Sequence, residues 1–310
     1  MAKSVCVFMS SYNGEKYIKE QIESILNQQL VDVHVFVRDD GSTDSTRNVV
    51  KEISKNDDRV SLVLGNNIGF EHSFMELCVT KDEYDYYAFS DQDDFWEQNR
   101  LHTAINKIGN KCSPCLYGSN FYIADKDLKI VGKWMNINQS KKLDARMKKY
   151  GAIGDNLFAC TMVWNKAFQK VLMSHRPTCK ISHDVWTQMV LDYVGGELIY
   201  DDTPTMLHRI HNSNTAGIAR GFLKKIKKGV KIYINSGISP KAIVANEINS
   251  AFFSRKHIES NKTMHRVFNL VMEYPHSFRK KMQLIFSRCF LGKPFGRWCF
   301  NSYLVLINKY

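Results

Sequence analysis

Short apolar segments alternate with helical segments through the first 110 residues, and this alternation restricts the fold more than any other feature of the chain. The predicted strands, rich in β-branched and aromatic residues, are residues 4–10, 33–37, 60–64 and 85–90. The predicted helices, with apolar residues at helical spacing, are residues 15–28, about 43–54, 71–80 and 97–109. Strands and helices that alternate in this way are typical of an α/β fold with a doubly wound, mainly parallel sheet.

Several kinds of site and segment are excluded by missing motifs. No G-x-G-x-x-G follows the first predicted strand, so a dinucleotide site has no support, and no P-loop pattern occurs. No apolar run approaches the ~18 residues that a membrane-spanning helix needs. The apolar segment at residues 5–9 is too short for a signal peptide, which predicts a cytoplasmic protein.

An acidic cluster follows the fourth predicted strand, in the sequence Ser90–Trp96. Asp91, Asp93 and Asp94 place three carboxylates within four residues, and their repulsion is costly without a cation. Asp91 and Asp93 alternate along an extended segment, so both can face one ion, and carboxylate oxygens suit Mg²⁺ or Mn²⁺. In open α/β sheets ligands bind at this end of a strand. The alternative is a solvated acidic turn in which Asp94 caps the next helix.

The charge is distributed unevenly along the chain. Residues 220–310 contain 18 Lys and Arg against 3 Asp and Glu, a net charge of +15, whereas residues 1–219 carry −3. A basic tail beside an acidic body predicts contact with an anionic surface. The eight cysteines are scattered, which predicts free thiols, and the single C-x-x-C at 112–115 lacks the second pair of a zinc site.

The region after residue 110 has a weaker pattern. Its predicted strands are residues 115–124, 129–134, 156–164 and 197–200. Its predicted helices are residues 165–173 and 184–194, followed by a basic, aromatic and amphipathic tail to Tyr310.

Five motifs, taken together and in order, resemble family 2 glycosyltransferases of the GT-A fold, in particular their rhamnosyltransferase-like branch. The motifs are residues 5–14, 38–44, 90–96, 183–186 and 209–212. The resemblance covers about residues 1–217. It implies a glycosyltransferase domain at 1–218, with a nucleotide-binding half at about 1–110 and an acceptor-side half at 111–218. Residues 219–310 would form a separate basic, helical region.

The resemblance implies a role for each motif residue. Ser10 and Tyr12 would contact the nucleotide base, and Asp40 would accept a hydrogen bond from a pyrimidine N–H, with Asp39 beside it. Gln92 and Trp96 would also belong to the donor site, with Trp96 and Trp186 as partial walls for the sugar. Asp91 and Asp93 would form the metal motif with Asp93 as the direct ligand, His211 would complete the metal or pyrophosphate site, and Asp184 would be the catalytic base. The family's lysine after the acidic motif is replaced here by Arg100.

Other interpretations remain open for single residues. Asp184 could be only a helix N-terminal charge, residues 39–41 a plain turn, and His208 and His211 a surface pair. If Asp184 is the base, its position at the start of a predicted helix would favour its ionised form.

These features predict an inverting, metal-dependent glycosyltransferase of surface polysaccharide biosynthesis, with Mn²⁺ or Mg²⁺ as cofactor. The expected donor is dTDP-L-rhamnose, or else a UDP-hexose, and the expected acceptor is a saccharide or a lipid-linked saccharide. The tail would hold the enzyme peripherally on the inner membrane face, with Phe290, Phe295, Trp298 and Phe300 in the interface. The alternatives are a non-catalytic sugar-nucleotide-binding relative and a protein that binds nucleic acid, without sequence specificity, through the tail.

Overall fold

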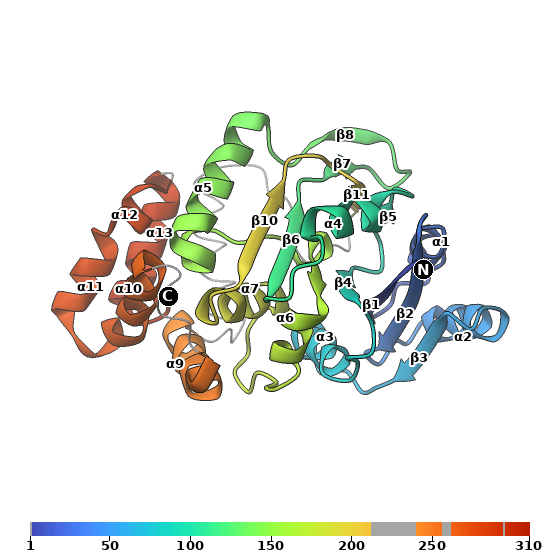
Figure 1. Cartoon of the computed structure of the whole chain (residues 1–310), viewed down its shortest axis with the longest axis horizontal. Coiled ribbons are helices and arrows are strands. Elements are labelled where there is room, and N and C mark those ends of the chain that lie inside the picture. Colours follow the sequence, from blue (N-terminus) through green and yellow to red (C-terminus); the bar gives the residue numbers. More distant parts are fainter. Residues whose placement is uncertain (1, 212–239, 256–261, 294) are drawn as a thin grey trace. The chain divides into compact units, whose positions relative to one another are not determined.

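The computed structural model describes residues 2–211, 240–255, 262–293 and 295–310 (Figure 1). The chain divides into two compact units. The first contains residues 1–142, 157–176 and 196–214, and the second contains residues 143–156, 177–195 and 215–310. Two segments that precede residue 218 therefore belong to the second unit, while the domain boundaries inferred from the resemblance stay a prediction. The Lys-rich run at 219–239 and Asn212 lie outside the described residues.

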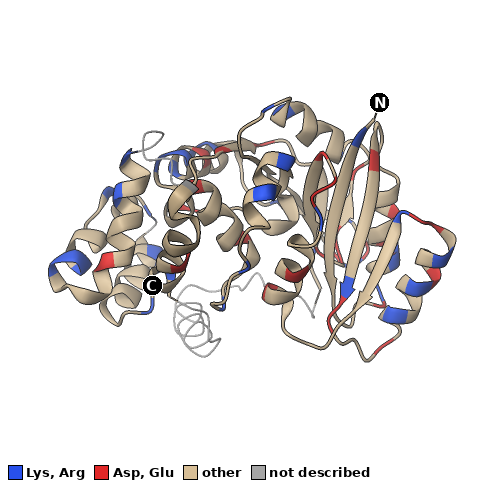
Figure 2. Ribbon diagram, turned by 60° about the horizontal axis from the view of Figure 1, so that its bottom comes forward, with Lys and Arg blue, Asp and Glu red and all other residues tan. Residues whose placement is uncertain are grey.

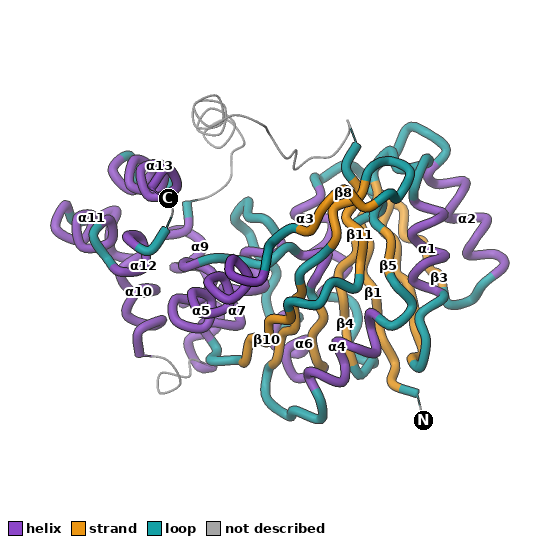
Figure 3. The backbone as a smooth tube through the Cα atoms, turned by 90° about the horizontal axis from the view of Figure 1, so that it is seen from above, coloured by secondary structure: helices purple, strands orange, loops and turns teal. Residues whose placement is uncertain are grey.

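The first unit is built on a mainly parallel sheet. Among the described residues, seven strands pair in the order β10-β6-β9-β4-β1-β2-β3, with β9 antiparallel to both neighbours (Figure 3). The strands are β1 (Lys3–Ser11), β2 (Val31–Asp39), β3 (Val60–Leu64), β4 (Tyr86–Ser90), β6 (Cys115–Ser119), β9 (Val163–Asn165) and β10 (Glu197–Asp201). Its helices are α1 (Ile18–Leu26), α2 (Thr46–Asn56), α3 (Phe70–Cys78), α4 (Arg100–Ile108) and α6 (Lys166–Leu172). The α/β fold and every element predicted for the first 110 residues are confirmed.

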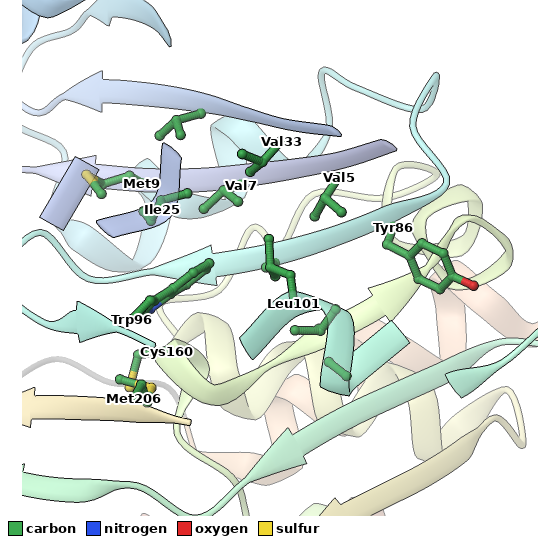
Figure 4. Packing of buried hydrophobic residues seen from close by; sticks show 14 of the residues in the cluster. Val5, Val7, Met9, Ile25, Val33, Tyr86, Trp96, Leu101, Cys160 and Met206 are labelled. Carbon is green, nitrogen blue, oxygen red and sulfur yellow. The ribbon is translucent and has the colours of Figure 1, made fainter. Parts of the chain in front are cut away.

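Helices cover both faces of this sheet, which explains why its central strands are apolar without interruption. On one face, Val5, Val7 and Met9 of β1 pack in a core that includes Ile22 of α1 and Leu101 of α4 (Figure 4). The opposite face carries an aromatic cluster. Its rings, with centroids 4.6 to 6.3 Å apart, are those of Phe8, Phe74, Tyr87, Phe89 and Trp164.

A smaller sheet of four described strands lies in the same unit, in the order β5-β11-β7-β8. Its strands are β5 (Phe95–Trp96), β11 (Met206–Arg209), β7 (Tyr122–Ala124) and β8 (Ile130–Lys133). β5 and β11 are not predicted from the sequence. The single strand predicted at 115–124 is wrong, because the chain leaves the large sheet after Ser119 and enters the small one at Tyr122.

Two further predictions differ from the structure. Residues 156–164 form a 3₁₀ turn, η1 (Ala159–Thr161), before the short β9 rather than one strand. Residues 137–154 form a helix, α5 (Ile137–Gly154), that the sequence analysis does not predict. Its buried residues Leu143, Met147 and Tyr150 follow helical spacing, but the surrounding charges obscure the pattern.

The second unit is helical in its described part, so the predicted helical C-terminal region is confirmed. Its helices are α7 (His183–Tyr193), α9 (Lys241–Phe252), α10 (Lys262–Glu273), α11 (Phe278–Ile285), α12 (Arg288–Leu291) and α13 (Phe295–Leu306), with the 3₁₀ turns η2 (Phe253–Arg255) and η3 (Tyr274–His276). Trp186 of α7 contacts Phe252 of α9, and Tyr193 contacts Phe268 of α10. No described helix is long and apolar enough to cross a bilayer.

Among the described glycines of this unit, Gly151 leaves the least room for a side chain. It interrupts α5 with φ +61°, and a Cβ atom there would lie 2.1 Å from Oδ2 of Asp192. Asp192 is fixed, because the same oxygen accepts a hydrogen bond of 2.6 Å from the backbone N–H of Ala152. We expect Gly151→Ala to destabilise the fold by about 2–4 kcal/mol, measured as a lower melting temperature. Gly109→Ala is the control: Gly109 shares the positive φ (+64°) but has open space around it, so a similar loss there would contradict the steric explanation.

Candidate functional site

The carboxyl ends of β1, β2 and β4 bring three of the sequence motifs to one edge of the large sheet. β1 pairs in parallel with both other strands, so Ser11 lies beside Asp39 and Met9 beside Ser90. Gln92 then ties the acidic loop to the end of β1, because its side-chain amide exchanges two hydrogen bonds, of 3.0 and 3.1 Å, with the backbone of Tyr12. Tyr12 itself is 46% exposed, as a residue that contacts a ligand needs to be.

Asp39 and Asp40 are both buried and hold the neighbouring loops. Asp39 accepts hydrogen bonds from the backbone N–H of Ser42 and from Arg47, at 2.9 and 2.6 Å. Burial raises the pKa of Asp39, but these hydrogen bonds outweigh it and lower that pKa below its usual value. Asp40 pairs with Arg38 and accepts the backbone N–H groups of residues 68 and 69, at 3.0 and 2.9 Å. A pyrimidine N–H at Asp40 would therefore share a carboxylate that already has three donors.

Strand β11 places two histidines against two adjacent carboxylates of the acidic loop. Nε2 of His211 lies 2.8 Å from Oδ2 of Asp93, and Nδ1 of His208 lies 2.8 Å from Oδ1 of Asp94. The pairing of β5 with β11 sets this register, because Trp96 lies opposite Met206 and Phe95 opposite Leu207. His211 and Asp93, both expected in the metal site, therefore contact each other, while their role in binding a metal stays a prediction. His208 and Asp94 are functional candidates that the sequence analysis does not assign.

A second group of potential metal ligands lies around His208. Single ligand atoms of Asp91, Asp94, Cys160 and His208 all lie within 4.8 Å of one another. Oδ2 of Asp94 is buried, and no donor in the described part of the chain lies within hydrogen-bond distance of it. Burial and the carboxylates of Asp94 and Asp91 raise the pKa of Cys160 well above its usual value, so its thiol stays protonated and is a poor ligand. The carboxylates of Asp91 and Asp94 that remain suit Mn²⁺ or Mg²⁺.

The charges of this cluster compensate one another in part. Burial and the neighbouring Asp94 raise the pKa of Asp93, against the effect of His211. Burial lowers the pKa of His208, but the Asp94 carboxylate outweighs it and raises that pKa to about 9. A proton on His208 therefore balances one carboxylate at neutral pH, and a divalent cation would replace that proton as the counter-charge.

Arg209 lies between the two histidines and holds the acidic loop to its surroundings. Its buried guanidinium donates to the backbone carbonyl of Asp93 at 2.9 Å and to that of Lys126 at 2.8 Å. It also pairs with Glu20 of α1 and lies 4.5 Å above the ring of Tyr17, which in turn contacts the His211 ring. One side chain thus connects α1, the acidic loop and the β7–β8 turn.

We expect Arg209→Lys to weaken manganese binding by about tenfold and to lower the melting temperature. The planar guanidinium of arginine donates hydrogen bonds to several acceptors at once, and the ammonium of lysine cannot reproduce that geometry. Calorimetric titration with Mn²⁺ measures the first effect and thermal unfolding the second. Arg59→Lys is the matched control, since Arg59 also bonds a carboxylate and a backbone carbonyl, those of Asp57 and Leu26. Equal manganese affinity in both variants would contradict the expectation.

The two tryptophans expected to serve partly as packing and partly as walls of the sugar site are both buried, so the packing is confirmed and the wall prediction is wrong. Trp96 packs in the core of the first unit, with the guanidinium of Arg100 4.4 Å from its ring centroid (Figure 4). Trp186 is buried in the second unit. Arg100, in the place of the family's lysine, is itself buried and donates to the carbonyl of Cys160, so it is not available at the surface.

Asp184 lies in the second unit, in the first turn of α7 and partly exposed. Its Oδ1 accepts hydrogen bonds from the hydroxyl of Ser182 and from the backbone N–H of Val185. Burial raises the pKa of Asp184 in spite of these bonds, so the helix N-terminus does not produce the lowered value expected from its position. Because the residue belongs to a different unit from the acidic loop, its approach to that loop stays a prediction.

The mainly parallel α/β sheet of the first unit, with the sequence motifs at its carboxyl edge, has the GT-A fold. Solved structures of this kind share the fold. S. aureus TarS 1–349 in complex with UDP-GlcNAc matches with a TM-score of 0.58 at 16% identity, over 99% of this chain and 88% of that one. The mannosyltransferase PcManGT from Pyrobaculum calidifontis, in complex with GDP-Man and Mn²⁺, matches with a TM-score of 0.54 at 14% identity, over 99% and 86%.

The sequence comparisons identify the family. The model of glycosyl transferase family 2 matches residues 6–172. The dTDP-rhamnosyl transferase RfbG of Shigella flexneri is 30% identical over 233 residues, which are 71% of this chain and 77% of that protein. The chain belongs to glycosyl transferase family 2, and the resemblance seen in the sequence is confirmed.

Proposed function

We propose that the protein is an inverting, metal-dependent glycosyltransferase that moves a sugar from a nucleotide-sugar donor to a saccharide acceptor. The observation that supports this is the pairing of His211 and His208 with Asp93 and Asp94 at the edge where the motifs of β1 and β2 also end. The donor that we favour is dTDP-L-rhamnose, since a relative of similar length is a dTDP-rhamnosyl transferase. A UDP-hexose is the alternative donor.

The nucleotide would bind along the edge formed by β1, β2 and the acidic loop. Tyr12 offers a half-exposed ring for stacking on the base, and Ser10 and Asp39 line the same strand ends. Asp91, Asp93 and His211 would hold a divalent cation beside the diphosphate. When bound, that cation supplies the positive charge that a departing diphosphate needs. Asp94 and His208 pair with each other next to these ligands, and their ligand atoms lie within 4.8 Å of that of Asp91.

Asp184 would take the proton from the acceptor hydroxyl as it attacks. A single base suffices for inversion, because the hydroxyl enters opposite the leaving diphosphate. The acceptor that we propose is a saccharide linked to lipid, in the synthesis of a surface polysaccharide at the inner face of the membrane. The donor and acceptor halves of the 1–218 region divide near residue 110 in this proposal.

A thermal-shift screen of nucleotide sugars with Mn²⁺ tests the donor assignment. A donor that binds only the native state at 100 times its Kd adds about 2.7 kcal/mol of stability. We expect dTDP-L-rhamnose to raise the melting temperature more than UDP-glucose or UDP-GlcNAc, and EDTA to remove the increase. A larger shift with a UDP-hexose would replace the donor, and no shift with any nucleotide sugar would reject the proposed function.

A further inference from the structure

Three phenylalanines of the second unit are strongly exposed. Phe278, Phe286 and Phe295 expose 72%, 57% and 77% of their surface. They lie on α11, on the residue that caps it, and on α13, all in the C-terminal part of the chain (Figure 1). Exposing apolar rings to water costs free energy. A patch of such rings would gain that free energy back by contacting an apolar phase such as a lipid bilayer.

The exposed rings follow one another along the two helices. Phe278 and the half-buried Met282 lie one turn apart on α11, and Phe286, which caps the helix, lies one turn further on, with the buried Leu284 on the opposite side. On α13, Phe295, Tyr303 and Leu306 are exposed, whereas Leu304 and Val305 are buried. Trp298 joins the two helices, because its ring centroid lies 6.4 Å from that of Phe286 and 5.9 Å from that of Phe295. We call this surface of α11 and α13 the aromatic face.

The segment that carries the aromatic face is strongly basic, and the nearby Glu273 and Asp155 each pair with one of its cations, Lys280 and Arg297. Residues 274–310 contain seven Lys and Arg and no Asp or Glu. Figure 2 shows these cations on the C-terminal helices, and Arg279 and Arg288 among them are exposed. Other cations are used within the unit: Lys281 donates to the carbonyl of Leu306, and Arg297 pairs with Asp155. The face therefore combines exposed aromatic rings with arginines next to them.

We propose that the aromatic face binds an anionic lipid bilayer, with the phenylalanine rings among the acyl chains and the arginines at the phosphates. Aromatic residues and Lys or Arg on one surface suit the interface of an anionic membrane, where the rings enter the acyl boundary and the basic residues are attracted to the lipid phosphates. A second copy of the chain would place like charges against each other across a two-fold axis, which disfavours it as the occupant. The binding is peripheral, through the α11–α13 surface.

The aromatic face differs in its residues from the membrane interface that the sequence predicts. Phe290, predicted from the sequence to enter the interface, is buried against Tyr310 with ring centroids 4.9 Å apart. That prediction is wrong. Trp298 donates its indole N–H to the carbonyl of Ile285 at 3.0 Å, so it holds α13 against α11 within the aromatic face. Phe278 and Phe286, which the sequence does not predict for the interface, belong to the aromatic face.

Flotation of the full-length protein with vesicles tests the proposal. We expect the protein to float with phosphatidylcholine vesicles that contain a third phosphatidylglycerol, and not with phosphatidylcholine alone. The triple variant Phe278→Ser, Phe286→Ser, Phe295→Ser should bind more than about tenfold more weakly, because each buried ring contributes. Arg279→Gln with Arg288→Gln should reduce binding to the anionic vesicles and leave the melting temperature unchanged.

Phe253→Ser is the matched control, since Phe253 is 68% exposed in the same unit but lies in η2, outside the aromatic face. Flotation of the triple variant at the wild-type level would overturn the proposal. So would a wild-type protein that fails to float and instead sediments as a dimer that the triple variant dissociates, which would assign the face to a second copy. The inference is independent of the proposed reaction, because flotation requires neither donor nor turnover.

Discussion

Asp184→Asn is expected to abolish sugar transfer and to leave nucleotide binding within a few fold of wild type. Asparagine keeps the size of the side chain and can still accept from Ser182 and Val185, but it cannot take a proton. Loss of a general base typically costs about 10²–10⁴-fold in rate. Transfer to acceptor measures the first effect, and titration calorimetry with the nucleoside diphosphate measures the second.

The pH profile adds a separate check on Asp184. The carboxylate must be ionised to act as a base, and burial raises its pKa. Activity should therefore be lost as the pH falls through that raised pKa, at a higher pH than for an exposed aspartate. Near-normal turnover of Asp184→Asn would show that Asp184 is not the base. Glu273→Gln, at an exposed carboxylate of the same unit, should leave both transfer and its pH profile unchanged.

Asp93→Asn is expected to damage metal binding, donor binding and turnover together. The substitution removes the charge that faces His211 at 2.8 Å and that a divalent cation would need. Stabilisation of a leaving diphosphate by a metal amounts to several kcal/mol, so we expect turnover to fall on the order of 10²–10³-fold. Manganese titration, donor KM and kcat should all change, unlike in Asp184→Asn.

The matched control for Asp93 is Asp127→Asn, an exposed carboxylate of the same unit that pairs only weakly with Lys126 at 3.5 Å. It should retain manganese affinity and turnover. If Asp93→Asn bound manganese as tightly as wild type, Asp94 and His208 would become the leading candidates for the metal site, since their ligand atoms already lie close to Asp91.

The fold of the first 110 residues could be predicted because its central strands, β1 and β4, are buried on both faces and each helix is buried on one. That burial imposes apolar runs and helical periods that a single sequence displays. The small sheet could not be predicted in this way. β5 has two residues and β11 four, so both are too short for a period, and both exist through their pairing with segments distant in the chain.

The site residues, too, could be predicted only in part from the sequence. Asp93 and His211 could be assigned because their motifs resemble those of the family, and the structure brings them together. His208, Asp94 and Arg209 were missed because their importance depends on the register of β5 against β11. The signal that could have revealed His208 and Asp94 was the spacing of three residues between His208 and His211, together with the two consecutive carboxylates at 93 and 94. Trp96 was misplaced because an aromatic residue beside a motif does not reveal whether it faces the core or a ligand.

The pairing of β5 with β11 has a consequence for how this protein can change. β5 begins directly after Asp94, and β11 ends two residues before His211. The register in which these two short strands pair therefore sets which histidine contacts which carboxylate. Adding or deleting one residue in either strand would shift every partner by one place and turn alternate side chains to the other side. Insertions here should therefore be more harmful than most substitutions.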